Sequence, residues 1–142
     1  MFIDASVIVA ILLGESDAAA FETRLEEAGG PFFISPLVRY EATVSIARAK
    51  AIAGNPDRAA SAEIMVEVRR GVETLIDTLQ AREIAISSDI GRLALDAAAL
   101  YGKAVGHRAR LNFGDCYSYA CAKAYRLELL YKGDDFAHTD LA

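Results

Sequence analysis

Residues 2–13 read FIDASVIVAILL, in which Phe2-Ile3-Asp4-Ala5-Ser6 leads into an unbroken apolar run over residues 7–13. Residues 2–4 predict a short hydrophobic strand, and Ser6 predicts the start of a helix over residues 7–13. Aspartate is depleted in strands, so Asp4 stands out where the strand ends. Asp4 is interpreted either as a turn or capping residue, or as a carboxylate at the carboxyl edge of a sheet.

The alternation of strand and helix continues along the rest of the chain. Further strands are predicted over residues 32–34, 83–86 and 128–131. Helices are predicted over residues 16–28, 36–53, 55–80, 88–101 and 115–125. The signals include glycines, which commonly end helices, and the Ser-Pro and Asn-Pro pairs, which commonly begin them. A basic loop is expected over residues 102–112, and a short polar tail after the last strand. This order predicts an α/β fold around a mostly parallel sheet, whose ligands gather outside the carboxyl ends of the strands.

The composition indicates one globular domain over residues 1–142. Hydrophobic residues make up 54% of the chain and charged residues 25%, which favours a packed core over disorder. The longest apolar run has seven residues, whereas a membrane span needs roughly twenty. The N-terminus has no basic region and no small-residue cleavage site. We therefore expect a cytoplasmic protein with no membrane partner.

The net charge argues against a non-specific nucleic-acid binder, and the cysteine spacing argues against a zinc site or a disulfide framework. The net charge is −5, from 15 basic and 20 acidic residues, whereas a non-specific nucleic-acid binder is usually basic. Cys116 and Cys121 are five positions apart, a spacing that indicates neither a zinc pair nor a disulfide framework. The informative feature is therefore where the excess acidic residues lie.

Five acidic residues lie where such a fold would bring ligands together: Asp4, Glu41, Asp115, Asp134 and Asp135. Each has a structural alternative. Glu41 could pair with Arg39 or Arg48, or lie in solvent. Asp115 could cap its helix, and the adjacent pair could form a turn. Their combination favours one shared sheet edge, because they follow strand ends or lie in the helices that adjoin them.

The mutual repulsion of clustered carboxylates must be offset. Two carboxylates about 5 Å apart repel by roughly 3 kcal/mol at an effective dielectric constant of about 20. They must take up protons or bind divalent cations. Oxygen ligands suit Mg²⁺ or Mn²⁺, whereas zinc favours His or Cys, and the histidines are His107 and His138. A cation held there could activate water and bind a phosphate oxygen.

At these residues the chain resembles the PIN-domain family, most closely the VapC-type toxins of bacterial toxin–antitoxin systems. The matching pieces cover nearly the whole chain: Phe2-Ile3-Asp4-Ala5-Ser6, Glu41, Leu111-Asn112-Phe113-Gly114-Asp115-Cys116 with Tyr119-Ala120, and Gly133-Asp134-Asp135-Phe136 with Thr139-Asp140. The resemblance implies a three-layer α/β/α PIN-like domain, with a short, mostly parallel central sheet and helices on both faces. It also implies a metal-dependent ribonuclease that hydrolyses RNA phosphodiester bonds with Mg²⁺ or Mn²⁺.

The resemblance further implies a role for each acidic residue. Asp4 and Asp115 would be the main metal ligands, and Glu41 would complete the shell, partly through waters. Ser6 would orient a metal-bound water, although capping of the first helix is its structural alternative.

The last acidic position is ambiguous within the resemblance. Family members often separate two acids by one residue before the final Asp-Phe, but here Gly133 occupies the earlier position. Asp135 ranks ahead of Asp134 as the metal ligand and catalytic residue, because it directly precedes Phe136.

The resemblance implies partners as well. RNA would be the substrate, and the basic loop before the Asn112–Asp115 motif could track its phosphates through Lys103, His107, Arg108 and Arg110. A solvated surface loop is the alternative for that segment. The family also implies a homodimer and a cognate antitoxin, which inserts a C-terminal segment near the active site.

Two other functions fit part of the pattern. A receiver domain shares the size and the α/β order, but it requires paired acids after the first strand, where only Asp4 stands. Its phosphoacceptor would end the third strand, which here runs into Ser87-Ser88-Asp89. A catalytically inactive PIN-like protein-binding module is the second alternative, suggested by the irregular Gly133-Asp134-Asp135 segment.

Overall fold

Four short parallel strands form the centre of the protein, in a computed structural model that describes residues 1–54 and 59–141. They are β1 (Phe2–Ile3), β2 (Phe33–Ile34), β3 (Arg82–Glu83) and β4 (Leu129–Leu130). Their order in the sheet is β3-β2-β1-β4, and each neighbouring pair runs parallel. The predicted parallel sheet is confirmed, with strands shorter than the sequence pattern indicates.

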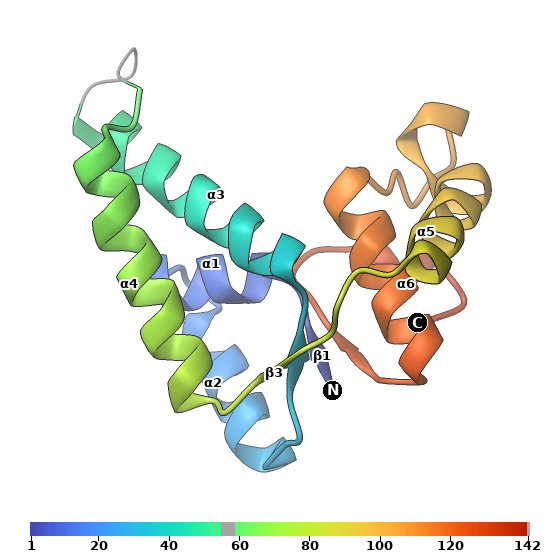
Figure 1. The fold of residues 1–142 in the computed structure, drawn as a ribbon, viewed down its shortest axis with the longest axis horizontal. Coiled ribbons are helices and arrows are strands. Elements are labelled where there is room, and N and C mark those ends of the chain that lie inside the picture. The colour runs from blue at the N-terminus through green and yellow to red at the C-terminus, as the bar shows by residue number, and fades with distance from the viewer. Residues whose placement is uncertain (55–58, 142) are drawn as a thin grey trace.

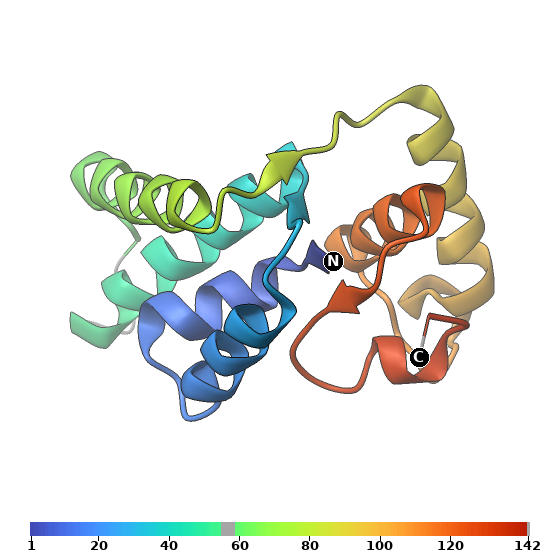
Figure 2. The same cartoon turned by 90° about the horizontal axis from the view of Figure 1, so that it is seen from below.

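Helices cover both faces of this sheet (Figure 1, Figure 2). The connection after β1 forms α1 (Ala5–Leu13) and α2 (Ala18–Ala28), and the connection after β2 forms α3 (Pro36–Gly54) and α4 (Ala62–Thr78). After β3 come α5 (Ser88–Tyr101), the 3₁₀ turn η1 (Lys103–Val105) and α6 (Phe113–Tyr125), and η2 (Phe136–His138) follows β4. Helices α1 to α4 lie on one side of the strands, and α5 and α6 on the other. The predicted three-layer α/β/α arrangement is confirmed.

The strand order reverses between β1 and β4. The chain steps outward from β1 to β2 and β3, and β4 then pairs with the other side of β1. In doubly wound sheets, ligands bind outside the carboxyl ends of the strands where this reversal occurs. Asp4 directly follows β1, and its backbone N–H donates to the carbonyl of Leu130 in β4 at 2.9 Å. The reversal therefore puts the first acidic residue beside the loop that follows β4.

Apolar side chains from both helical layers bury the short sheet. Phe2 and Ile3 are fully buried, and they share one core cluster with Val7 of α1 and Cys121 of α6. Both cysteines are free and buried, and burial raises the pKa of Cys121 to about 11. Within residues 1–54 and 59–141, no helix combines the length and the apolar character that a membrane crossing requires.

The predicted start of the first helix was wrong, and that of the fourth falls outside the described residues. Helix α1 begins at Ala5, because Asp4 rather than Ser6 is its N-cap. Asn55 and Pro56, the predicted start of the fourth helix, lie outside the described residues; the described helix α4 begins at Ala62. Ser61 caps it by accepting a hydrogen bond from the N–H of Ile64.

The predicted loop over residues 102–112 is more ordered than expected. It contains η1, and Gly102 forms an isolated bridge with Leu111. Helix α6 begins at Phe113, two residues before Asp115, because Asn112 supplies the N-cap. Strand β3 covers Arg82–Glu83 rather than residues 83–86, because its pairing partner β2 ends at Ile34. The tail also forms η2, in which Phe136 is buried.

Candidate active site

Asp4 is fixed at the end of β1 by the start of the next helix. Its side chain is only 5% exposed. Its Oδ1 accepts hydrogen bonds from the backbone N–H of Ser6 at 2.9 Å and from the Ser6 hydroxyl at 2.6 Å. The Ser6 Oγ in turn accepts the backbone N–H of Lys132 at 3.0 Å. Capping and a site role are therefore compatible, because these bonds use one of the two carboxylate oxygens.

Asp115 is held in the same way at the start of α6. Its backbone N–H donates to Asn112 Oδ1 at 3.1 Å, and its Oδ2 accepts the backbone N–H of Asn112 at 2.7 Å. This reciprocal capping box places a carboxylate rigidly in the first turn of the helix. Asp115 therefore caps its helix, as Asp4 does, and its side chain uses only one carboxylate oxygen in doing so.

Glu41 reaches the site from the second turn of α3. Arg39, one of its expected ion-pair partners, instead pairs with Glu83 at 3.1 Å. The Glu41 carboxylate lies against Gly114 in the first turn of α6. A Cβ added to Gly114 would stand 2.7 Å from Glu41 Cδ and even closer to Oε2. The absence of a side chain at Gly114 is what lets the carboxylate lie there.

These residues line one pocket of about 360 Å³ at the carboxyl edge of the sheet. We call it the acidic pocket, and its lining residues are Asp4, Ala5, Ser6, Val9, Glu15, Glu41, Ser45, Asn112, Asp115, Lys132, Asp135 and Phe136. Of the adjacent pair after β4, Asp135 lines the pocket and Asp134 is outside the lining. The structure therefore brings together Asp4, Glu41, Asp115 and Asp135 from four separate segments.

The carboxylates influence one another's ionisation. Burial raises the pKa of Glu41 to about 7, with added repulsion from Asp4 and Asp115. Burial also raises the pKa of Asp115 to about 6, and the charges of Asp4 and Asp135 add to it, whereas the hydrogen bond from Asn112 opposes the shift. Near neutral pH the pocket therefore holds negative charge that favours a proton or a cation.

The raised pKa values of Glu41 and Asp115 predict a pH-dependent stability. Both groups bind protons more tightly in the folded chain than in the unfolded chain, so unfolding free energy falls as pH rises through about 4 to 7. We expect the Tm of the metal-free chain to be roughly 5 °C lower at about pH 8 than at about pH 5.5. Thermal unfolding followed by circular dichroism in chelator measures this. Glu41→Gln should flatten the dependence, and a Tm that rises towards pH 8 would contradict it.

A family model described as a PIN domain matches residues 1–141. The chain belongs to the PIN-domain family. This PIN domain is 48% identical to a VapC ribonuclease of Rhizobium meliloti (strain 1021) over 142 residues, which cover 99% of this chain and 98% of that protein. It is 39% identical to ribonuclease VapC42 of Mycobacterium tuberculosis (strain ATCC 25618 / H37Rv) over 141 residues, covering 99% and 96% of the two chains. These relatives place the PIN domain in the VapC group.

A solved structure shares the fold of this PIN domain. It is a chain of a toxin–antitoxin complex from Klebsiella pneumoniae, with a TM-score of 0.66 and 20% sequence identity. The match covers 99% of this chain and 92% of that one.

The donor set of the PIN domain fits a divalent cation that prefers oxygen. The acidic pocket offers carboxylates and the Ser6 hydroxyl but no His or Cys. In the described part of the chain, no group of three or more His, Cys, Asp or Glu side chains is arranged to hold a metal ion directly. Mg²⁺ usually keeps several waters and binds through one or two carboxylates. The pocket therefore suits a partly hydrated cation better than a fully protein-ligated one.

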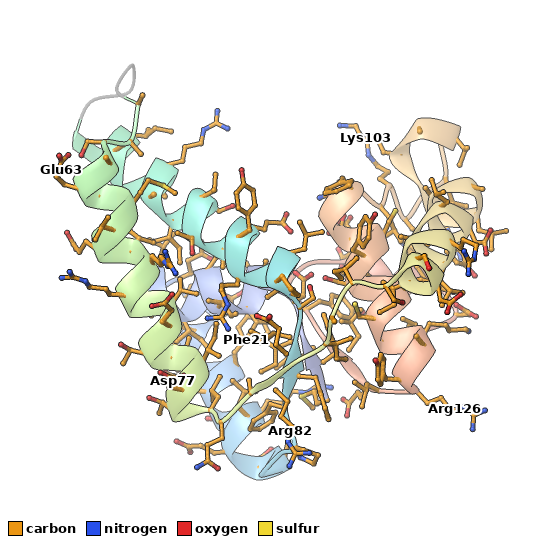
Figure 3. All side chains as sticks on the ribbon, in the orientation of Figure 1. Phe21, Glu63, Asp77, Arg82, Lys103 and Arg126 are labelled. Carbon is orange, nitrogen blue, oxygen red and sulfur yellow. The ribbon has the colours of Figure 1, made fainter. Side chains whose placement is uncertain are left out.

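The basic loop of the PIN domain reaches the acidic pocket through Asn112 but through none of its basic side chains. Lys103 extends outward from the end of the α5 and α6 layer (Figure 3). His107 packs edge-on against Tyr101, and its Nδ1 accepts the N–H of Ala109 at 3.1 Å. The side chains of Arg108 and Arg110 are exposed. None of the four predicted RNA-binding side chains of this loop lines the acidic pocket, so their role stays a prediction.

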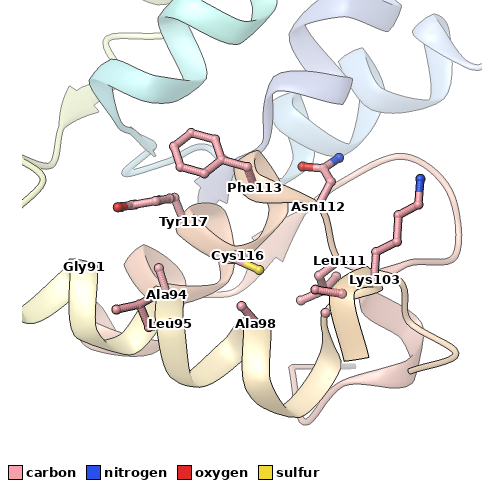
Figure 4. Close-up of a pocket in the computed structure, with 12 residues that line it drawn as sticks. Gly91, Ala94, Leu95, Ala98, Lys103, Leu111, Asn112, Phe113, Cys116 and Tyr117 are labelled. Atoms are coloured by element: carbon pink, nitrogen blue, oxygen red, sulfur yellow. The ribbon is translucent and has the colours of Figure 1, made fainter. Parts of the chain in front are cut away.

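A second, apolar pocket adjoins the acidic one. It measures about 470 Å³ and lies between α5 and the first turn of α6, with Leu95 and Phe113 on its walls (Figure 4). Asn112 lines both pockets. Phe113 is 70% exposed and Leu95 72%. The surface beside the site is therefore unusually apolar for a solvent-facing helix start.

Sequence reasoning missed several residues of the acidic pocket. Lys132 and Glu15 both line it, and the Lys132 ammonium pairs with Glu15 at 2.5 Å. Glu15 follows the end of α1, where an acid usually signals only a solvated turn. Lys132 stands directly before Gly133 in the segment that carried the family resemblance. The position of Lys132 just past the last strand could have predicted that it lies at the carboxyl edge of the sheet.

Proposed function

We propose that this VapC-type PIN domain is a ribonuclease toxin that hydrolyses phosphodiester bonds of cytoplasmic RNA with the help of Mg²⁺ or Mn²⁺. The observation that carries the proposal is the acidic pocket, where Asp4, Glu41, Asp115 and Asp135 meet at the strand reversal. The full-length relatives named as VapC ribonucleases support it.

Asp4, Asp115 and Asp135 are proposed to hold the cation together with its bound waters. Asp4 and Asp115 are locked in place by their helix caps, so they need little reorganisation when a cation binds. A bound Mg²⁺ or Mn²⁺ lowers the pKa of a coordinated water and offsets negative charge on a phosphate. Asp134, outside the pocket lining, is proposed to have no part in this binding.

Beside the cation, Glu41 is proposed to accept a proton, and Ser6 is proposed to orient the Asp4 carboxylate. The Glu41 pKa of about 7 lets its carboxylate accept a proton near neutral pH. The Ser6 hydroxyl donates to Asp4 Oδ1 and accepts from the Lys132 backbone. Ser6 therefore orients the Asp4 carboxylate and ties it to the loop after β4.

Metal removal tests the proposed function. The purified chain, freed of any partner, should cleave total cellular RNA in Mg²⁺ or Mn²⁺, lose cleavage in chelator, and regain it when the metal is restored. Gel analysis of 5′-labelled RNA fragments measures this. Equal cleavage with and without chelator would mean either a contaminating nuclease or a metal-independent mechanism, and Asp4→Asn prepared in parallel separates the two. A folded chain that neither cleaves RNA nor binds Mn²⁺ would overturn the proposal.

The inactive binding-module alternative is not favoured. A module without catalysis would gain nothing from clustered, mutually repelling carboxylates, because they lower its stability. The PIN domain nevertheless keeps all four of them around one pocket. The receiver-domain alternative has no support in the family match.

We also propose that a cognate antitoxin protein holds this chain inactive and that the toxin forms a homodimer. The solved relative of similar fold comes from a toxin–antitoxin complex. An arginine of the antitoxin would suit the acidic pocket, because a guanidinium pairs bidentately with carboxylates. Light scattering of the purified chain tests the homodimer, and loss of cleavage on titration with the antitoxin tests the inhibition.

A further inference from the structure

We propose that Lys132 binds a phosphate oxygen of the RNA at the rim of the acidic pocket. This inference rests on the proposed ribonuclease function and adds a substrate-binding residue to it. Among the described residues that line the pocket, Lys132 is the one with a positively charged side chain. The other charged lining residues are acidic: Asp4, Glu15, Glu41, Asp115 and Asp135.

The backbone of Lys132 is fixed relative to the catalytic acids. Its N–H donates to Ser6 Oγ at 3.0 Å, and the Ser6 hydroxyl donates to Asp4 Oδ1 at 2.6 Å. Two hydrogen bonds thus connect the lysine backbone to the carboxylate at the end of β1. A substrate group bound by this lysine would be held at a defined place beside Asp4.

The ammonium is held in position but has a donor to spare. It donates to Glu15 Oε2 at 2.5 Å and to Asp17 Oδ1 at 2.9 Å. A lysine ammonium has three N–H donors, so these two bonds leave one. The hydrogen bonds to Glu15 and Asp17 raise the pKa of Lys132, which keeps the side chain charged. Its side chain is 35% exposed, so the remaining donor is accessible to a ligand.

The ion pairs of Lys132 can yield to a phosphate. The side chains of these pairs are about one-third exposed, so water screens part of the attraction between the charges. The pocket carries several negative charges, which would repel an incoming RNA backbone, and a local cation offsets that repulsion. The loop over residues 102–112 reaches the pocket through Asn112, but none of its basic side chains lines it. Lys132 is therefore the residue placed to hold the strand close to the acids.

Binding of a labelled single-stranded RNA tests the proposal. Fluorescence anisotropy in chelator avoids strand cleavage during the measurement. Lys132→Gln should raise the Kd about tenfold and lower the slope of log Kd against log salt by about 0.7, the value for one phosphate contact. Lys50→Gln is the matched control, because Lys50 pairs with Glu67 at 2.9 Å and lies outside the pocket lining. Lys132→Arg, which keeps the charge, should retain most of the affinity.

A second variant separates substrate binding from a structural tie. Asp17→Asn frees the ammonium from one partner and should tighten RNA binding, the opposite of Lys132→Gln. If the lysine only joined the α1–α2 turn to the loop after β4, both variants would weaken binding alike. That result, or a Lys132→Gln chain with the wild-type Kd and salt slope, would overturn the inference. A wild-type chain that neither binds nor cleaves RNA would instead overturn the proposed function.

Discussion

Replacing Asp115 with Asn is expected to lower RNA cleavage about 10³-fold, because the cation proposed to bind there would contribute several kcal/mol to the transition state. The same change should raise the Tm of the metal-free chain by a few degrees. An Asn side chain keeps an oxygen for the N–H of Asn112, so the cap of α6 is retained. It also removes a half-buried charge that Asp4 and Asp135 repel. Initial cleavage rates in Mn²⁺ and a thermal melt in chelator measure the two effects.

Asp134→Asn is the matched control for this prediction. It removes one negative charge from the neighbour of Asp135, but Asp134 does not line the acidic pocket. Its cleavage rate should stay within about twofold of the wild type. If Asp134→Asn and Asp115→Asn lose activity equally, the assignment of the last acidic position to Asp135 is wrong. If Asp115→Asn melts well below the wild type, its loss of activity reports unfolding instead.

Replacing Gly114 with Ala is expected to lower cleavage about 10- to 100-fold without lowering the Tm. The added methyl would overlap the Glu41 carboxylate, which is the flexible end of its side chain and can move aside. Moving it aside takes Glu41 away from Asp4 and Asp115. Stability should hold or improve, because alanine is favoured over glycine within a helix by about 1 kcal/mol. Cleavage rates and the Kd for Mn²⁺ from calorimetry measure the loss.

A double variant tests whether the effect passes through Glu41. Glu41→Asp shortens the side chain by one methylene and makes room for the new methyl at position 114. Adding it to Gly114→Ala should therefore recover activity about tenfold, although Glu41→Asp alone reduces activity. Gly91→Ala is the control, because a methyl there meets no atom within 4 Å. Additive losses in the double variant would show that Gly114 acts by another route.

The acids could be predicted because they break local rules. Asp4 comes directly after a hydrophobic strand, and the parallel order of the strands puts their carboxyl ends at one edge. The order of strands and helices therefore gave both the fold class and the shared edge. The family resemblance ranked Asp135 ahead of Asp134, but local preferences could not decide between them, because adjacent residues in a turn point in different directions. That choice depends on the path of the loop after β4.

The role of Gly114 was out of reach for the same reason. A glycine before an aspartate reads as an ordinary helix start, and the need for it comes from Glu41, seventy-three positions earlier in the chain. The pairing of Lys132 with Glu15 likewise joins distant segments. Capping also misled the prediction at Ser6, because both Asp4 and Ser6 are good N-cap residues and local preference cannot rank them.

The double use of Asp4 and Asp115 has a practical consequence for handling a toxic enzyme. Each side chain caps a helix through one carboxylate oxygen, and both residues line the acidic pocket. Asn at either position should preserve the helix cap, the fold and the protein surface, but it should abolish RNA cleavage. Asp4→Asn and Asp115→Asn chains should therefore accumulate in growing bacteria where the wild type arrests them. They can then be used to isolate bound, uncut RNA for sequencing and to test for the proposed antitoxin partner.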